Sequence, residues 1–156
     1  MDLILWRHAE AELGTSLLPD EARKLSVKGI KQASKMAGWL DTHLPENCRI
    51  LVSPTVRTRE TAAALKRKFK IVEELAPGST VETILDICHW PDHKKSALIV
   101  GHQPTLGMIA AQLLFPGAHE CDIRKGTIWW IAQKTCEDET VNNYLKVVMT
   151  PSLLLK

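Results

Sequence analysis

Three segments of the chain carry side chains that can bind or attack a phosphoryl group. The first is Arg7-His8, which directly follows an apolar run at residues 3–6. A guanidinium can hold two phosphate oxygens at once, and an imidazole can serve as a nucleophile. Taken alone, the pair favours a surface arginine beside a histidine bonded to a backbone carbonyl. The phosphoryl interpretation therefore depends on the other two segments.

The second segment, Ser-Pro-Thr-Val-Arg-Thr-Arg-Glu-Thr at residues 53–61, puts Arg57 in the first turn of a predicted helix. Free N–H groups and the helix dipole already favour anions there, and arginine is normally favoured at the other end. A bound phosphate would justify this placement, because a guanidinium can grip two of its oxygens. The alternative is a surface ion pair with Glu60, which remains open for Arg59. We expect Arg57 to bind phosphate.

The third segment, Gly-His-Gln-Pro-Thr at residues 101–105, sets His102 at the start of another predicted helix. Gly101 would allow the backbone to approach a ligand closely, although His102 alone could also be a simple capping residue. If the three segments meet, two arginines, two histidines and two helix starts surround one pocket. Such a pocket favours a phosphoryl group.

The elements that must position these segments alternate along the chain. Apolar runs at residues 3–6, 50–52 and 97–100 predict buried parallel strands, and helices are predicted at 27–44, 55–69, 79–89 and 104–115. Late strands are predicted at 127–132 and 144–149, with Trp129 and Trp130 facing opposite sides. This pattern predicts an α/β fold, a single-domain three-layer sandwich at residues 1–156. Its sheet is mostly parallel, with helices on both faces and an antiparallel carboxyl-terminal pair. Ligands bind beyond the carboxyl ends of such strands, so we expect all three segments at that edge.

The first predicted helix has two contrasting faces behind its N-cap, Ser26. The residues expected to face the core are Val27, Ile30, Ala33, Ala37 and Leu40. A second set, Lys24, Lys28, Lys31 and Lys35, follows steps of four, three and four, and aligns along one side of this helix and of the residues that lead into it. These lysines are either a solvated face or a stripe that guides an acidic phosphoprotein.

Composition narrows the class of protein. Hydrophobic residues make up 45% and charged residues 24% of the 156 residues, as in ordinary globular domains. The start lacks the features of a signal peptide, and no apolar run reaches the length of a membrane span. The cysteines, Cys48, Cys88, Cys121 and Cys136, show no C-x-x-C spacing. We therefore expect a cytoplasmic protein with reduced thiols, no structural zinc and no membrane partner.

Charge is unevenly distributed along the chain. Residues 1–70 hold 13 Lys and Arg against 8 Asp and Glu, whereas the remainder holds 7 against 10. The excess is too small and too dispersed for a nucleic-acid interface, which would show a clustered basic stripe. A small anionic ligand, phosphate or a phosphate analogue, fits the amino-terminal half better.

These segments together make the chain resemble the histidine phosphatase superfamily, and in particular its short SixA-type phosphohistidine phosphatases. The resemblance covers nearly the whole chain. It rests on Arg7-His8-Ala9, Arg23-x-Leu25-Ser26-x-x-Gly29, Leu51-Val52-Ser53-Pro54-x-x-Arg57-x-x-x-Thr61, Glu74-Leu75-x-Pro77 and Val100-Gly101-His102-x-Pro104. In this order and spacing the set is highly specific. The usual Arg-His-Gly triplet has Ala9 in place of its glycine, which bears on the backbone turn after His8.

The resemblance implies a role for each residue of the pocket. His8 would be the nucleophile, Arg7, Arg57 and His102 would surround the phosphate, and Arg23 would lie nearby. No metal or organic cofactor is expected. Many members of the superfamily use a glutamate as general acid for an alcohol leaving group. Glu74 is the nearest candidate by position, and it is equally well explained as a surface carboxylate.

The expected reaction is transfer of a phosphoryl group to His8, followed by hydrolysis by water. An imidazole leaves more readily than an alkoxide and depends less on a general acid such as Glu74, which favours a phosphohistidine-containing partner protein as substrate. The alternatives are a small-molecule phosphomonoesterase or mutase of the same superfamily, and a regulator that binds phosphoproteins without hydrolysing them. A metalloenzyme using His89 and His93 is disfavoured, because Pro91 interrupts any helix between them.

Overall fold

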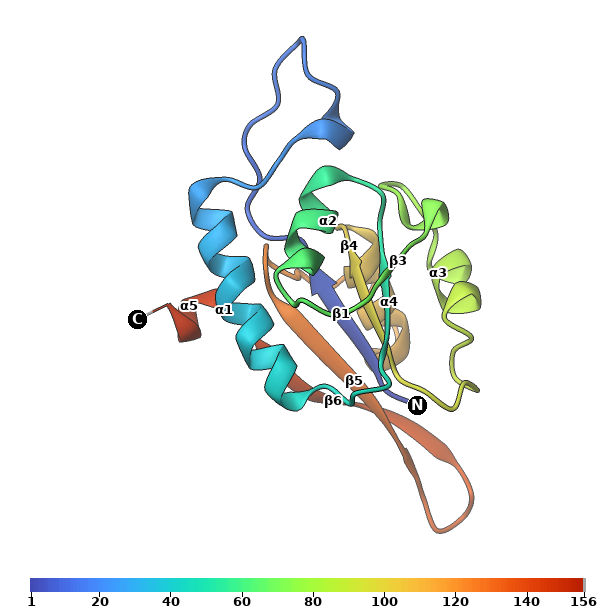
Figure 1. Ribbon diagram of the computed structural model, residues 1–156. Coiled ribbons are helices and arrows are strands. Elements are labelled where there is room, and N and C mark those ends of the chain that lie inside the picture. The colour runs from blue at the N-terminus through green and yellow to red at the C-terminus, as the bar shows by residue number, and fades with distance from the viewer. Residues whose placement is uncertain (156) are drawn as a thin grey trace.

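Six strands form one mixed sheet in the computed structural model, which describes residues 1–155 (Figure 1). Lys156, the last residue of the predicted domain, lies outside the described residues. The strand order is β3-β2-β4-β1-β5-β6, in which β1 to β4 run parallel and β5 and β6 run antiparallel. The strands are β1 (Leu3–Arg7), β2 (Arg49–Val52), β3 (Lys70–Ile71), β4 (Ala97–Gly101), β5 (Ile128–Thr135) and β6 (Val141–Met149). The mostly parallel sheet with an antiparallel carboxyl-terminal pair is therefore confirmed.

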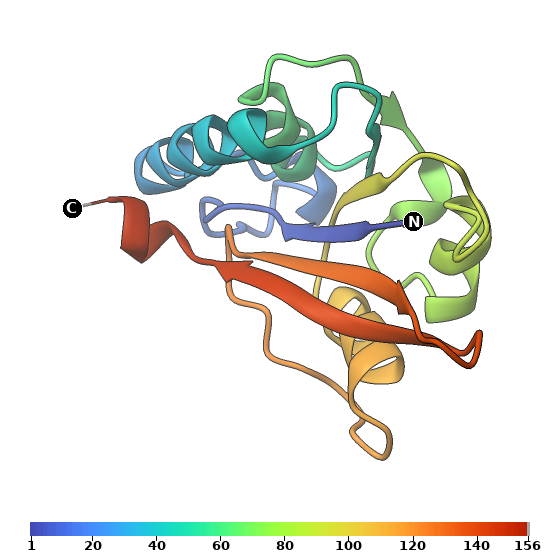
Figure 2. The same ribbon diagram turned by 90° about the horizontal axis from the view of Figure 1, so that it is seen from below.

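Helices cover both faces of this sheet, as Figure 2 shows. The α-helices are α1 (Val27–His43), α2 (Val56–Ala63), α3 (Val81–Ile87), α4 (Thr105–Leu114) and α5 (Pro151–Leu154), and short 3-10 helices lie at η1 (Asp20–Ala22) and η2 (Glu73–Leu75). Alternate residues of β1 point to opposite sides. Leu3 and Leu5 pack in the cluster with α3 and α4, whereas Ile4 and Trp6 pack in the cluster with α1 and α2. The predicted three-layer arrangement is confirmed.

The register of the central strands brings their carboxyl ends to one level. Arg7 of β1 pairs with Gly101 of β4, and Val52 of β2 pairs with Val100 of β4. Backbone hydrogen bonds continue past the strands: the N–H of His8 donates to Gly101 O (3.2 Å), and that of Ser53 donates to Val100 O (3.1 Å). The three polar segments therefore meet at one edge of the sheet, as the strand order requires.

The longest helix, α1, begins where the sequence predicts but faces the core differently. The Ser26 hydroxyl accepts the N–H of Gly29 (3.0 Å), which confirms the N-cap. Val27 and Ile30 are 74% and 56% exposed, so their predicted place in the core is wrong. Gly29, Ala33, Met36, Ala37 and Leu40 form the buried face instead. No helix within residues 1–155 is both long and apolar enough to cross a bilayer.

Helix α2 is shorter than its composition predicts. It ends at Ala63 and not near residue 69, because Leu65 turns into the core at 4% exposure and Lys66 takes a positive φ of 55°. Arg67 then bonds back to α1 through Asp41 Oδ1 (2.9 Å). The freed residues reach the sheet as β3. Tertiary contacts thus override a favourable run of helix-forming residues.

The carboxyl-terminal hairpin is longer than predicted. Residues 133–135 of β5 pair with residues 141–143 of β6, although mostly polar side chains hide the strand signal there. Trp130 packs with the α1 layer and Trp129 packs against the α3 and α4 layer. The expectation that the two indoles face opposite sides of the strand is confirmed.

Candidate active site

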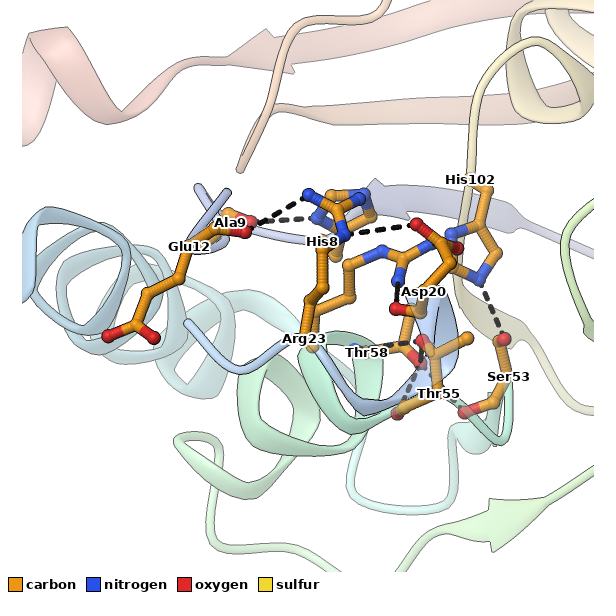
Figure 3. A network of polar contacts seen from close by, with 10 residues as sticks. His8, Ala9, Glu12, Asp20, Arg23, Ser53, Thr55, Thr58 and His102 are labelled. Atoms are coloured by element: carbon orange, nitrogen blue, oxygen red, sulfur yellow. Dashed lines mark hydrogen bonds and ion pairs between the residues drawn. The ribbon is translucent and has the colours of Figure 1, made fainter. Parts of the chain in front are cut away.

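The two histidines lie together beyond the carboxyl ends of β1 and β4. The rings of His8 and His102 have centroids 5.4 Å apart and are tilted by 55° (Figure 3). Each residue is only 6% exposed. The structure therefore brings together two imidazoles that lie 94 residues apart in the chain, inside a largely buried site.

His8 is held in one tautomer by its own loop. Its Nδ1 lies 2.7 Å from the carbonyl oxygen of Ala9, which can only accept a hydrogen bond, so Nδ1 carries the proton. Burial lowers the pKa of His8 to about 4, and the charges of Arg57, Arg7 and Arg23 act in the same direction against the bond to Ala9. At neutral pH the ring is uncharged, and the lone pair of Nε2 is available to an electrophile.

Ala9 is closely packed in the turn after His8. The residue is fully buried and packs with Leu25 and Ala33. Its N–H donates to Thr61 Oγ1 (3.1 Å), and that hydroxyl donates to Arg57 O (2.8 Å). Helix α2 thus supports the loop that orients His8. A methyl group in place of the usual glycine is accommodated here.

Arg57 lies in the first turn of α2 and is 4% exposed. Its Nη1 donates to Asp20 O (2.9 Å) and its Nη2 to Asp20 Oδ2 (3.1 Å). Its partner is therefore Asp20 and not Glu60, whose carboxylate accepts the N–H of Leu25 (2.9 Å). The Nε of Arg57 is buried and has no hydrogen-bond partner among the described residues.

Arg7 is fixed in a similar way. Its Nη1 donates to the carbonyl of Ile123 (2.9 Å), while its Nε is buried and has no partner within residues 1–155. Burial lowers the pKa of Arg7 below its ordinary value. Among the described residues, both arginines thus use a terminal nitrogen to bond the backbone and keep the buried Nε donor free, which is the arrangement expected around an oxyanion.

His102 belongs to the same hydrogen-bonded cluster. Its Nε2 lies 2.7 Å from Ser53 Oγ, at the end of β2. Burial lowers the pKa of His102 to about 3, and the charges of His8 and Arg57 add to this effect. Its side chain bonds Ser53 and does not cap α4, whose N-cap residue is Pro104.

Arg23 reaches the site through a residue that the sequence did not single out. Its Nε contacts Asp20 Oδ1 (3.0 Å), and its Nη1 donates to Glu12 O (3.1 Å). Asp20 and Arg23 have the i, i+3 spacing of a local ion pair, which is the signal available in the sequence. Nothing in the sequence relates Asp20 to Arg57, which lies 37 residues later.

Glu74 is placed apart from these residues. It is exposed and lines a groove of about 730 Å³ together with Leu51, Ile87 and His89. Its neighbour Glu73 lines a different cavity, of about 460 Å³, together with Asp20 and Thr55. Glu73 and not Glu74 is thus the carboxylate of this turn on the side of Asp20.

His89 and His93, the pair of the metalloenzyme alternative, lie in the loop between α3 and β4. His89 and His93 stack with centroids 5.9 Å apart, but no cluster of three or more metal-binding side chains occurs within residues 1–155.

In the pocket, three guanidinium groups and one carboxylate leave two net positive charges beside two neutral imidazoles. A phosphoryl group carries about −1.5 to −2 at neutral pH, so the charges match.

Known proteins share this sequence and this geometry. The model of the histidine phosphatase superfamily (branch 1) matches residues 3–78. A phosphohistidine phosphatase SixA homolog of Haemophilus influenzae is 37% identical over 128 residues, covering 72% of this chain and 77% of its own. Phosphohistidine phosphatase SixA of Escherichia coli is 27% identical over 121 residues, covering 72% and 74%. A structure of the protein histidine phosphatase SixA complexed with tungstate superposes over 100% of both chains, with a TM-score of 0.78 and 25% identity.

Proposed function

Since the chain belongs to the histidine phosphatase superfamily, we propose that it removes the phosphoryl group from a phosphohistidine on a partner protein. The observation that carries this proposal is the state of His8. Its proton is held on Nδ1 by Ala9 O, and its Nε2 lone pair lies in a pocket of guanidinium groups. A neutral, oriented imidazole in a cationic pocket is suited to attack phosphorus.

In the first step, Nε2 of His8 forms a bond to phosphorus while the bond from phosphorus to the substrate nitrogen breaks. The electron pair of that bond returns to the substrate imidazole. The unpartnered Nε donors of Arg7 and Arg57 would bond the equatorial oxygens, where charge is concentrated during transfer. His102 would contact the same phosphoryl group from the β4 side.

In the second step, water attacks phosphorus and the bond to Nε2 of His8 breaks. The phosphorylated ring is a cation, because the proton stays on Nδ1, where it is hydrogen-bonded to Ala9 O. The departing electron pair therefore returns His8 to its neutral form, and the water proton leaves with phosphate or solvent. Each step uses groups already present in the pocket, so we propose that the reaction needs no metal.

The substrate class is supported by the leaving group and by the relatives. A phosphohistidine protonated at its distal nitrogen leaves as a neutral imidazole and needs no general acid, which suits the position of Glu74 outside the pocket. The relatives carry the names of phosphohistidine phosphatases. A structural neighbour binds tungstate, a tetrahedral oxyanion like phosphate.

A small-molecule phosphomonoesterase is the second candidate, and Glu73 is the observation that favours it. This carboxyl group lines the cavity beside Asp20, where it would be close to an alcohol leaving group. The leaving group of such an ester is an alkoxide, and its departure depends on a general acid of this kind. The two candidates therefore differ in leaving group and share the rest of the pocket.

Two broader expectations belong to the same proposal. We propose that residues 1–156 work as one histidine phosphatase domain, since all six strands join one sheet. We also propose that the protein acts in the cytoplasm, in keeping with its four free cysteines.

One experiment separates these functions. Turnover is measured on a phosphohistidine-containing protein and on a panel of sugar and aryl phosphates, with and without a strong chelator. The proposal predicts the highest kcat/KM on the phosphohistidine protein, unchanged by the chelator. A preference for the esters would favour the phosphomonoesterase, and loss of activity with the chelator would contradict metal independence.

A further inference from the structure

Within residues 1–155, Asp20 is the one carboxylate that bonds the guanidinium groups of the pocket. It lies in η1, on the loop that joins β1 to α1, and in Figure 3 it lies between Arg23 and His102. One carboxylate oxygen contacts Arg23 Nε (3.0 Å) and the other contacts Arg57 Nη2 (3.1 Å). Its backbone carbonyl also accepts from Arg57 Nη1 (2.9 Å). Asp20 thus bonds both terminal nitrogens of Arg57.

These contacts decide which edge of Arg57 can face a phosphoryl group. With both terminal nitrogens bonded to Asp20, the remaining donor is Nε, which is buried and has no partner within residues 1–155. The two-pronged grip expected from the sequence is therefore already made, to the backbone carbonyl and the carboxylate of Asp20. A phosphoryl group that accepts from Nε would lie next to the Asp20 carboxylate.

The position of Asp20 relative to the solvent is also unusual for this cluster. Its side chain is 62% exposed, whereas that of Arg57 is 5% exposed. The carboxylate therefore stands at the outer side of the site, while His8 lies buried within it. A nucleophile attacks phosphorus from the side opposite the leaving group, so an outer carboxylate is placed on the side from which the leaving group departs.

The charge of Asp20 persists at neutral pH and is felt in the pocket. Burial raises the pKa of the Asp20 carboxyl, but the charges and hydrogen bonds of Arg57 and Arg23 together hold that pKa below the ordinary range. Asp20 also raises the pKa of His102, against the stronger lowering by burial. A fixed negative charge therefore acts on any imidazole that enters the site.

We propose that Asp20 is a specificity-determining residue that favours a phosphoryl group leaving from nitrogen over one leaving from oxygen. This inference rests on the proposed function. A phosphohistidine protonated at its distal nitrogen carries positive charge, which falls to zero as the phosphorus–nitrogen bond breaks. In the transition state its ring is still partly positive, and the carboxylate stabilises it relative to free substrate.

A phosphate ester behaves in the opposite way beside the same carboxylate. As the phosphorus–oxygen bond breaks, the electron pair stays on oxygen and negative charge develops on the leaving group. The carboxylate repels this charge, so the transition state for the ester is disfavoured. One residue thus separates two substrate classes by the sign of the charge on the leaving group.

The test compares the variant Asp20→Asn with the wild type on two small substrates, free phosphohistidine and p-nitrophenyl phosphate. Small substrates avoid any contribution from a protein docking surface. We expect kcat/KM for phosphohistidine to fall at least about tenfold relative to kcat/KM for p-nitrophenyl phosphate, since one charge interaction is removed. Glu21→Gln removes a charge from the same 3-10 helix and should leave the ratio unchanged, because the Glu21 side chain makes no bond to Arg57 within residues 1–155.

Further variants separate specificity from a purely structural role. Asp20→Glu keeps the charge and should preserve the ratio even if both rates fall. This variant also provides the test if Asp20→Asn proves unstable in thermal unfolding. An equal loss on both substrates in Asp20→Asn, an unchanged ratio, or a changed ratio in Asp20→Glu would overturn the inference. Failure of the wild type to hydrolyse phosphohistidine at all would instead contradict the proposed function.

Discussion

At the scale of single residues, the site depends on keeping two imidazoles neutral among arginines. The pKa of His8 is lowered to about 4 and that of His102 to about 3, in each case mainly by burial. A protonated His8 would lose the lone pair on Nε2. The same environment that stabilises a phosphoryl anion therefore also preserves the nucleophile before the substrate arrives.

The lowered pKa of His8 predicts a pH-dependent stability. The unfolded chain takes up a proton on His8 below about pH 6.5, whereas the folded chain takes it up only near pH 4. The contribution of neutral His8 is thus intact above pH 6.5 and declines as the pH falls to about 4, by on the order of 3 kcal/mol. This contribution is measured by urea unfolding of the wild type and of His8→Gln at a series of pH values. Curves of wild type and variant that stay parallel would contradict the assignment.

Arg57→Lys should lose most of the turnover although the positive charge is kept. A lysine provides neither the free Nε donor nor the two contacts to Asp20, and removal of one well-placed donor costs about a hundredfold or more. The measurement is kcat on phosphohistidine, with thermal unfolding to verify the fold. Arg59→Lys, at an exposed position two residues later, is the matched control. Equal rates for the two variants would contradict the role of Arg57 in binding the phosphoryl group.

At the scale of secondary structure, the buried strands and capped helices could be predicted, because apolar runs and Ser26 carry local signals. The end of α2 could not, because it depends on Leu65 entering the core and on Arg67 bonding Asp41. The core face of α1 was displaced for a similar reason. Its first turn packs against the loop that follows β1, where Gly29 meets Glu10, and this leaves Val27 and Ile30 in solvent.

The close approach of α1 to the loop after His8 predicts opposite effects for two glycines of one helix. A Cβ at Gly29 would clash with the backbone carbonyl of Glu10, whereas one at Gly38 meets nothing within 4 Å. Gly29→Ala should destabilise the fold by about 1–3 kcal/mol. Gly38→Ala should stabilise it by about 0.5–1 kcal/mol, through helix propensity. Chemical denaturation measures both, and stabilisation by Gly29→Ala would contradict the packing described.

Lys28, Lys31 and Lys35 of α1, with Lys24 just before the helix, lead to a prediction about the partner protein. All four are exposed, and Lys28 lines a cleft of about 480 Å³ together with Arg7, Arg124 and Lys125. If this surface guides an acidic phosphoprotein, reversing Lys24 and Lys28 to glutamate should slow its association about tenfold or more at low salt. Stopped-flow binding at low and high ionic strength measures this effect.

The control for the lysine prediction is a reversal of equal charge elsewhere. Lys94 and Lys134 are exposed at positions remote from the carboxyl edge of the sheet, and their conversion to glutamate should leave the association rate nearly unchanged. Small phosphate esters should be hydrolysed at similar rates by every variant. Equal slowing by both double variants would indicate that Lys24 and Lys28 belong to a solvated face and do not guide the partner.

At the scale of the whole molecule, the site exists because the parallel strands end at one level. Sequence analysis could place Arg7, His8, Arg57 and His102 at that edge, since each directly follows an apolar run or begins a helix. It could not find Asp20, because the segment between β1 and α1 has no hydrophobic period and its contact with Arg57 spans 37 residues.

The most direct test of the central claim is the capture of the phosphoryl group on the enzyme. A phosphohistidine-containing protein with a labelled phosphoryl group is mixed with the wild type and quenched at alkaline pH within the first turnover. The label should then appear on His8 in an acid-labile bond, as expected for phosphorus bound to imidazole, and His8→Ala should neither accept label nor release phosphate while remaining folded. Full turnover by folded His8→Ala, or label on any other residue of the wild type, would contradict the account.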